Sequence, residues 1–175
     1  MEKCPNATCG GAFQDCDRLT SITFPKTLTH IESFAFSGCS ALRNIVLPDS
    51  LIEVGSEAFS HSGLISIDWP AGVTALSNRV FSQSSQLRSV VISEGVTTIG
   101  EGAFAGTPGL ISVTLPSTIR NIGENAFYDC SALTTVTIPD TVESISIGRN
   151  SFSGAIRLNL ASQAALRRVG FAGNF

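Results

Sequence analysis

Phenylalanine recurs at an almost constant interval along this chain, and that interval limits the folds open to it. The positions are Phe13, Phe36, Phe59, Phe81, Phe104 and Phe127. The successive intervals are 23, 23, 22, 23 and 23 residues. A repeat of this length is typical of solenoids, in which each unit stacks only on its neighbours. The sequence therefore predicts a stack of similar units with phenylalanine in the core.

The residues around each phenylalanine keep the same phase. A short alternating stretch ends in proline in most units: ITFP at 22–25, IVLP at 45–48, IDWP at 67–70, VTLP at 113–116 and VTIP at 136–139, with VVIS at 90–93 as the variant. Its period of two and its β-branched residues predict a strand, which the proline ends because it has no N–H to donate.

A second apolar pair follows each strand, and a glycine such as Gly55, Gly100 or Gly123 often follows that pair. We expect these glycines to form a bend with positive φ. The segment from glycine to cysteine or serine, for example 123–131, is predicted to be a short helical or 3-10 turn on the outer side. The whole unit is LxxIxLPxxLxxIGxxAFxxCxx.

This unit resembles the BspA-like, or treponemal-type, leucine-rich repeats, and the resemblance covers residues 12–142. It implies an α/β repeat fold: a right-handed leucine-rich-repeat solenoid with a parallel β-sheet on the concave face and short helical or 3-10 turns on the convex side. It also implies adhesion and binding of host proteins, since the family's members are mostly surface or secreted proteins of bacteria and protists.

We expect one domain over residues 1–175. It comprises an irregular N-terminal edge at 1–11, regular repeats of about 23 residues at 12–142, and a degenerate C-terminal repeat or cap at 143–175. The first repeat begins partway through a unit, which leaves open a preceding repeat or cap. In the cap, Leu166, Val169 and Phe171 align with the strand positions of a last unit.

Charge and hydropathy exclude several function classes. The net charge is −3, with no basic surface for nucleic acid. No apolar run approaches the roughly 18 to 20 residues that span a bilayer, and the start lacks a secretory signal. The chain after Glu143 carries only positive charges, namely Arg149, Arg157, Arg167 and Arg168. These arginines either solvate a terminal repeat or steer a head-to-tail contact or a phosphate-bearing partner.

The cysteines fall into two groups. Cys16, Cys39 and Cys130 each lie three residues after their phenylalanine, where other units have serine or threonine. We interpret them as small packed residues of the repeat. Cys4 and Cys9 lie outside this phase and flank the sequon at Asn6, so they are a candidate disulfide beside a candidate glycosylation site, with free thiols as the alternative.

No catalytic or metal-binding set emerges from the sequence. His30 and His61 occupy variable positions and are interpreted as surface residues, and Glu53, Glu57 and Asp68 as solvated carboxylates. No cysteine or histidine spacing matches a metal site, and no nucleophile, base and acid share a fixed phase. We expect no enzyme activity and no cofactor.

One face of the predicted sheet is the candidate binding surface. Its proposed contact patch is Arg43, Ile65, Asp68, Arg88 and Ile111. Alternatively, the many Thr and Ser residues there merely suit an exposed parallel strand.

The leading functional hypothesis is a noncatalytic protein-binding or adhesion module that uses its concave surface. It would be extracellular or at the cell surface, with a protein or glycan ligand. The second hypothesis is an intracellular scaffold or assembly subunit, favoured by the missing signal sequence and by cysteines compatible with free thiols. The third is an enzyme, because loops can place an active site on any fold.

Overall fold

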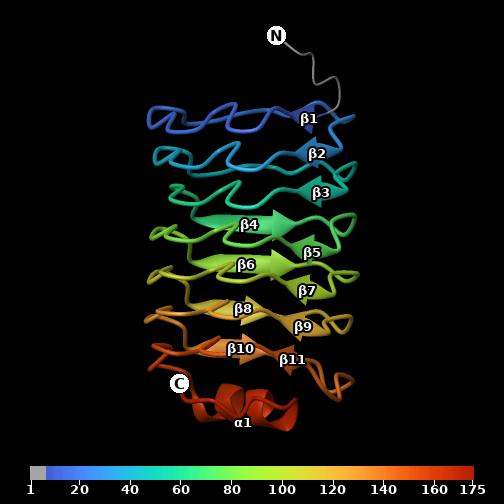
Figure 1. Cartoon of the computed structure of the whole chain (residues 1–175), viewed down its shortest axis with the longest axis vertical. Helices are drawn as coiled ribbons and strands as arrows, with labels where there is room; N and C mark the ends of the chain where they lie inside the picture. The colour runs from blue at the N-terminus through green and yellow to red at the C-terminus, as the bar shows by residue number, and fades with distance from the viewer. Residues whose placement is uncertain (1–6) are drawn as a thin grey trace.

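The chain forms a stack of similar coils with two rows of short strands (Figure 1). This computed structural model describes residues 7–175. All strand pairs within these residues are parallel. The predicted solenoid with parallel strands is therefore confirmed.

The first row lies where the alternating stretches of the sequence predict strands. It consists of β4 (Ser66–Trp69), β6 (Ser89–Ile92), β8 (Ser112–Thr114) and β10 (Thr135–Thr137). These strands form one sheet in the order β10-β8-β6-β4. Strand β4 pairs in register with β6, Ile67 opposite Val90 and Trp69 opposite Ile92, because the units repeat with almost no change in length.

The second row contains two-residue strands, and all of them except the first end on the isoleucine, valine or leucine of the second apolar pair. They are β1 (Ala7–Thr8), β2 (His30–Ile31), β3 (Glu53–Val54), β5 (Ala75–Leu76), β7 (Thr98–Ile99), β9 (Asn121–Ile122) and β11 (Ser146–Ile147). They form two sheets, β1-β2-β3 and β11-β9-β7-β5. The sequence predicts the apolar pair here but not a second ladder.

Two of the predicted strands do not form. No backbone hydrogen bond joins residues 20–25 to residues 43–48, or residues 44–48 to residues 66–70, in the described chain. A cavity of about 630 Å³ lies between the first two segments, lined by residues that include Ile22, Phe24 and Val46. The prediction of strands at 22–25 and 45–48 is therefore wrong.

The phenylalanines form one continuous column through the core. Ring centroids of successive residues from Phe13 to Phe127 lie 5.1 to 5.8 Å apart, with the planes at most 15° from parallel. Phe152 extends the column at 5.0 Å from Phe127. All of these rings except that of Phe13 are fully buried. The column is the core that the 23-residue interval predicts.

The outer side is built from consecutive turns and not from the predicted short helical or 3-10 turns. The backbone amides of Asn125, Phe127 and Asp129 donate to carbonyls of the next coil at 2.9, 2.7 and 2.8 Å. The intervening amides donate within their own coil, as Tyr128 does to Asn125 at 3.0 Å. A helix would keep every such bond internal. Alternate amides therefore form a further ladder between coils.

Left-handed backbone at fixed positions makes this alternation possible. Asn125 and Asp129, two residues before and two after Phe127, have φ values of 56° and 55°. Each unit repeats the pair: Gly11 with Asp15, Phe34 with Gly38, Glu57 with His61, Arg79 with Gln83, Gly102 with Gly106, and Asn150 with Gly154. A left-handed residue reverses the direction of the peptide group that follows it. Successive amides therefore donate alternately within their own coil and to the next coil.

The repeated glycine has a different role from the one predicted. Gly55, Gly100 and Gly123 are not among the residues with positive φ. A Cβ on Gly123 would lie 2.6 Å from the nitrogen of Glu101 and 2.7 Å from the carbonyl carbon of Gly100. Glycine is needed here because two coils approach too closely for a side chain, and not for a bend.

A column of small polar side chains runs beside the phenylalanines. Cys39, Ser84, Thr107 and Cys130 each donate to a phenylalanine carbonyl of the preceding coil, at 3.1, 2.9, 3.1 and 3.1 Å respectively. Cys16, Cys39 and Cys130 are free thiols, and Cys39 and Cys130 are buried. The exchange of Cys for Ser or Thr in the sequence follows from this shared hydrogen bond.

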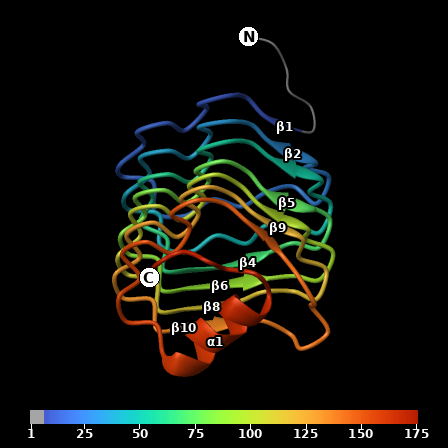
Figure 2. The same cartoon turned by 60° about the horizontal axis from the view of Figure 1, so that its bottom comes forward.

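The chain ends in a helix that covers the last coil. Helix α1 (Leu160–Arg168) lies beside β10 at the end of the stack (Figure 2). The side chain of Asn159 caps it by accepting a hydrogen bond from the amide of Ser162 at 2.8 Å. The alignment of Leu166 with a strand position is therefore wrong: the segment rich in alanine, leucine and arginine favours a helix.

The C-terminal arginines are part of this cap. Arg167 lies 5.3 Å from the Phe171 ring centroid and 4.9 Å from that of Phe175. Arg168 donates to the carbonyl of Val142 at 2.7 Å. Phe171 closes the core by packing edge-on against Phe152 at 5.3 Å. These contacts favour the structural interpretation of Arg167 and Arg168 over the steering of a partner.

Candidate binding face

The sheet of β4, β6, β8 and β10 presents alternate residues to solvent. In β4, Ile67 and Trp69 are buried while Ser66 and Asp68 are exposed. The residue before the strand, Ile65, is also exposed. We call the outward side of this sheet, with residues 43–46 before it, the binding face. Its orientation follows from the period of two along each strand.

The four residues predicted as a central stripe are neighbours on this face. The amide of Ile65 donates to the carbonyl of Arg43 at 3.1 Å, and that of Arg88 to Ile65 at 2.8 Å. The amide of Ile111 donates in turn to Arg88 at 3.0 Å. We call these four residues the arginine column. Each of these residues follows the leucine of its unit, and arginine alternates with isoleucine from one unit to the next.

Asp68, the fifth predicted patch residue, lies in a separate column. It is in register with Val91, which is in register with Thr114 and then Thr137. A row of hydroxyls, Ser66, Ser89, Ser112 and Thr135, lies between the two columns in sequence position and in register. The structure therefore places Asp68 on the same face as the arginines. It lies two residues after Ser66, which belongs to the row of hydroxyls.

The face also exposes apolar side chains that the predicted patch omits. Val46 is 83% exposed and Val91 is 57% exposed, compared with 42% for Ile65 and 47% for Ile111. Val91 points outward from β6, and Val46 is exposed between the buried Ile45 and Leu47. The predicted patch contains four residues of the arginine column and Asp68, but neither valine.

The arginines of this face have no carboxylate partner in the described part of the chain. The ion pairs between residues 7 and 175 join His30 to Glu53, Arg79 to Glu101 and Arg168 to Asp140. Arg88 donates to the carbonyl of Gly109 at 3.4 Å, which directs its side chain toward the next coil. Both guanidinium groups of the arginine column are available to an outside anion.

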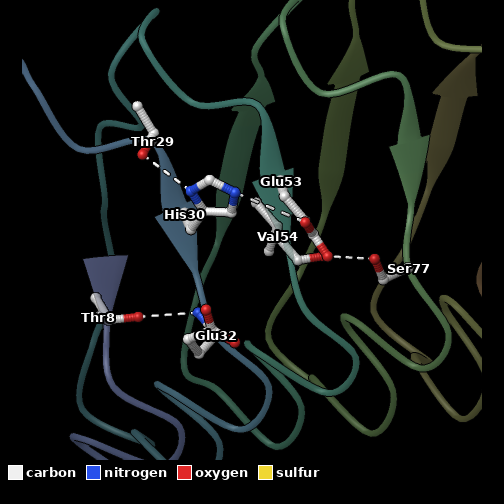
Figure 3. Close-up of polar contacts among 7 residues, drawn as sticks. All are labelled: Thr8, Thr29, His30, Glu32, Glu53, Val54 and Ser77. Atoms are coloured by element: carbon white, nitrogen blue, oxygen red, sulfur yellow. Dashed lines mark hydrogen bonds and ion pairs between the residues drawn. The ribbon is translucent and has the colours of Figure 1, made fainter. Parts of the chain in front are cut away.

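The second row of strands carries a polar cluster at its first coils (Figure 3). His30 in β2 makes a 2.9 Å contact with the Thr29 hydroxyl and lies 3.8 Å from Glu53 in β3. The amide of Glu32 donates to the Thr8 hydroxyl at 3.0 Å. The Ser77 hydroxyl donates to the carbonyl of Val54. Each contact joins residues on neighbouring coils or adjacent positions, so the cluster links the coils together.

The remaining candidate residues add no reactive site. Cys4 and Asn6 lie outside the described residues, so the disulfide with Cys9 and the glycosylation stay predictions. His61 is exposed at a left-handed turn position. No group of three or more His, Cys, Asp or Glu residues within 7–175 is arranged to hold a metal ion. In the same range, no helix has the length and apolar character to cross a membrane.

Solved structures of bacterial leucine-rich repeat proteins resemble this chain, and three of them follow. A leucine-rich repeat protein from T. pallidum is 32% identical with a TM-score of 0.88, and the match covers 97% of this chain and 78% of that one. One from Bacteroides ovatus is 28% identical with a TM-score of 0.80, covering 88% of this chain and 40% of the other. One from Eubacterium ventriosum is 29% identical with a TM-score of 0.71, covering 78% and 37%. This chain thus spans less than half of the latter two proteins. Among curated proteins, none matches it.

The repeat itself matches a family model over nearly the whole chain. The model describes the BspA type leucine rich repeat region and matches six copies, over residues 9–134 and 120–165. These ranges include every coil of the phenylalanine column. They also include the strands of the binding face and the beginning of α1. The chain therefore belongs to the BspA-type leucine-rich-repeat family.

Proposed function

We propose that this chain is a noncatalytic recognition module that binds a partner protein through the binding face. The observation that carries the proposal is the gathering of apolar side chains there. Val46, Ile65, Val91 and Ile111 make up four of the nine large hydrophobic residues exposed in the described chain. Exposed apolar side chains that cluster on one face mark interaction surfaces more often than scattered ones do.

The architecture supports the same proposal. Strands with side chains fixed by a ladder form a rigid surface, so that binding costs little conformational entropy. The arginine column adds charged donors beside the apolar side chains, and arginine is enriched in protein interfaces. A partner contacting several coils at once would gain from a surface that no single coil provides.

The finer proposal is adhesion at the cell surface. Its support is the N-terminal sequence, where Cys4 and Cys9 flank the sequon at Asn6. The second candidate is an intracellular scaffold, favoured by the free thiols Cys39 and Cys130. Protein purified from its native compartment distinguishes them by thiol titration and mass spectrometry. A Cys4–Cys9 bridge with a modified Asn6 supports the surface role, and reduced Cys4 and Cys9 with an unmodified Asn6 support the scaffold.

Paired variants test the binding face. Ile65→Asp with Ile111→Asp places charge on its apolar side chains, and Ile52→Asp with Ile156→Asp makes the same change at residues that are exposed elsewhere, 58% and 75% respectively. Each immobilised protein is incubated with the same native extract, and the retained proteins are quantified. We expect that some proteins of the extract are retained by the wild-type chain and by the control variant but not by the binding-face variant.

Equal retention by both variants would contradict the use of this face. Circular dichroism and thermal unfolding of the two variants establish that both remain folded, so that a loss of binding reports the surface. Substrate turnover that disappears on changing one defined residue would contradict the noncatalytic part of the proposal.

A further inference from the structure

The arginine column combines two unpaired positive charges with a fixed separation. Arg43 and Arg88 lie on either side of Ile65, linked to it through backbone hydrogen bonds of 3.1 and 2.8 Å. Neither arginine has an ion pair within the described chain. Arg18 and Arg157 are likewise exposed and have no ion pair in the described chain, but Arg43 and Arg88 lie together in one column of the binding face. A ligand with negative charges would supply the partners that the described chain does not.

The ladder sets the separation of the two backbone positions that carry the arginines. Adjacent strands lie about 4.8 Å apart, so the backbones of Arg43 and Arg88 are roughly 9.6 Å apart along the stack. A polyproline II segment has three residues per turn and rises about 3.1 Å per residue, so its equivalent side chains recur every ~9.3 Å. In a β-strand they recur every ~6.7 Å, which does not match.

We propose that the partner segment bound by this face is an acidic peptide in the polyproline II conformation, with a carboxylate at every third residue. The segment runs along the stack, across the strands, and places successive carboxylates against Arg43 and Arg88. The inference deepens the proposed function and rests on it, since it names the chemistry of the protein segment that the binding face recognises.

The isoleucines explain why the ligand is a peptide. Ile65 lies between the two arginines and Ile111 follows Arg88, both exposed, at 42% and 47% respectively. An apolar residue between two acidic ones covers each isoleucine and removes it from water. An anionic polysaccharide would carry charge at a similar spacing but would place hydroxyls against these side chains.

Asp68 fixes the path of the segment across the face. Its carboxylate is exposed and lies in the column of Val91, beyond the row of serines. An acidic segment lying over that column would meet a like charge. The attraction of the arginine column and the repulsion of Asp68 together hold the segment on one side of the sheet.

The test uses a defined probe and the purified chain. The probe is a fluorescein-labelled peptide of four aspartate-isoleucine-proline triplets, and its binding is followed by fluorescence anisotropy. We expect saturable binding that weakens as salt is added, because exposed ion pairs are screened. A peptide with lysine in place of aspartate, and one with its four aspartates adjacent, are expected to bind at least about tenfold more weakly.

Matched charge reversals locate the site. The variant Arg43→Glu with Arg88→Glu is expected to weaken probe binding by about tenfold or more, since two attractive pairs become repulsive. The control Arg18→Glu with Arg157→Glu makes the same change in net charge at two exposed arginines, each one residue before the leucine of its unit. The control is expected to bind the probe as the wild-type chain does.

Three results would overturn the inference. They are no binding of the aspartate peptide, equal binding of the peptide with adjacent aspartates, and equal weakening in both double variants. A heparin fragment that binds through Arg43 and Arg88 while the peptide does not would identify a polysaccharide ligand instead. The extract experiment on Ile65 and Ile111 can succeed when the peptide fails, and in that case the proposed function stands and the acidic segment does not.

Discussion

The side-chain hydroxyl of Ser162 in α1 accepts a hydrogen bond from the backbone amide of Val136 in β10 at 2.9 Å, in a buried position. Strand β10 is the last strand of its sheet, so this amide has no further strand to pair with. The helix thus supplies through one side chain an acceptor that a further strand would have supplied. The amide of Asn159 continues the ladder to the Thr134 carbonyl at 2.9 Å.

We expect Ser162→Ala to destabilise the chain by about 1 to 3 kcal/mol, because the Val136 amide would stay buried without a partner. Urea unfolding followed by circular dichroism gives the difference in the free energy of unfolding. Ser85→Ala is the control, since Ser85 is exposed and its side chain makes no hydrogen bond within the described chain. A loss as large in the control would show that Ser162 has no special role.

Gly123→Ala is expected to cost about 1 to 3 kcal/mol, since the added methyl would press against the backbone of Gly100 and Glu101. Gly10→Ala is the matched control, because its Cβ would meet only the carbonyl of Ser33, at 3.7 Å. The midpoints of thermal unfolding compare the two. If Gly123→Ala unfolds at the wild-type temperature, the coils can separate locally and close approach does not explain the repeated glycine.

Burial raises the pKa of the Cys130 thiol to about 12, compared with an ordinary value of 9.0. Above pH 9 the unfolded chain loses this proton while the folded chain keeps it. Ionisation therefore stabilises the unfolded state and lowers the free energy of unfolding. The stability that Cys130 contributes is therefore complete below pH 9 and declines between pH 9 and about 12. Cys130→Ser, which keeps the hydrogen bond to Phe104, should lack this decline.

Measurement of the free energy of unfolding of both proteins between pH 7 and 11 checks this expectation. The difference between them should be constant below pH 9 and should then move in favour of the serine variant. Parallel curves over the whole range would show that the Cys130 thiol ionises as readily in the folded chain as in the unfolded one.

Glu94 accepts two hydrogen bonds from Ser117 of the next coil, from the amide at 3.0 Å and from the hydroxyl at 2.8 Å. The amide bond, followed by the hydroxyl bond, lowers the pKa of Glu94 below its ordinary value of 4.5. The stabilising contribution is therefore present above pH 4.5 and is lost as the pH falls through the lower, folded value.

Acid unfolding of Glu94→Gln should accordingly show a weaker dependence on pH below 4.5 than that of the wild-type chain. Glu143→Gln removes an exposed carboxylate with no ion pair in the described chain and serves as the control. A Glu94 variant whose acid transition coincides with that of the wild-type chain would contradict the role of these two bonds.

The positions that face inward could be predicted from the sequence because each unit repeats the same pattern of apolar residues. Phenylalanine at Phe59 and leucine at Leu64 must be buried in every coil, since stacking is the only way to cover them. The alternation IDWP likewise predicts that Trp69 points inward and Asp68 outward. The arginine column followed from the same phase, and the same pattern predicts Val46 and Val91 outward, although the predicted patch does not include them.

The outer turns could not be predicted in the same way. The sequence NAFYDC contains polar and apolar residues that suit a helical turn, and Phe34, Glu57 and Arg79 take left-handed φ although such residues rarely do. Their conformation is stabilised by amides that bond to the next coil, as Phe34 does to Ser56 at 3.1 Å. Those acceptors exist only once the neighbouring coil is in place.

The sequence by itself determined the repeat, its core residues and the face that each strand turns outward, because these depend on periods within one unit. The tertiary structure decided which backbone groups pair, why glycine is required at Gly123, that 22–25 and 45–48 remain unpaired, and that α1 closes the stack. Those outcomes depend on the distance between neighbouring coils and on what remains to be paired at the last one. The pattern of residues within one unit does not specify the distance between coils or the groups left unpaired at the last coil.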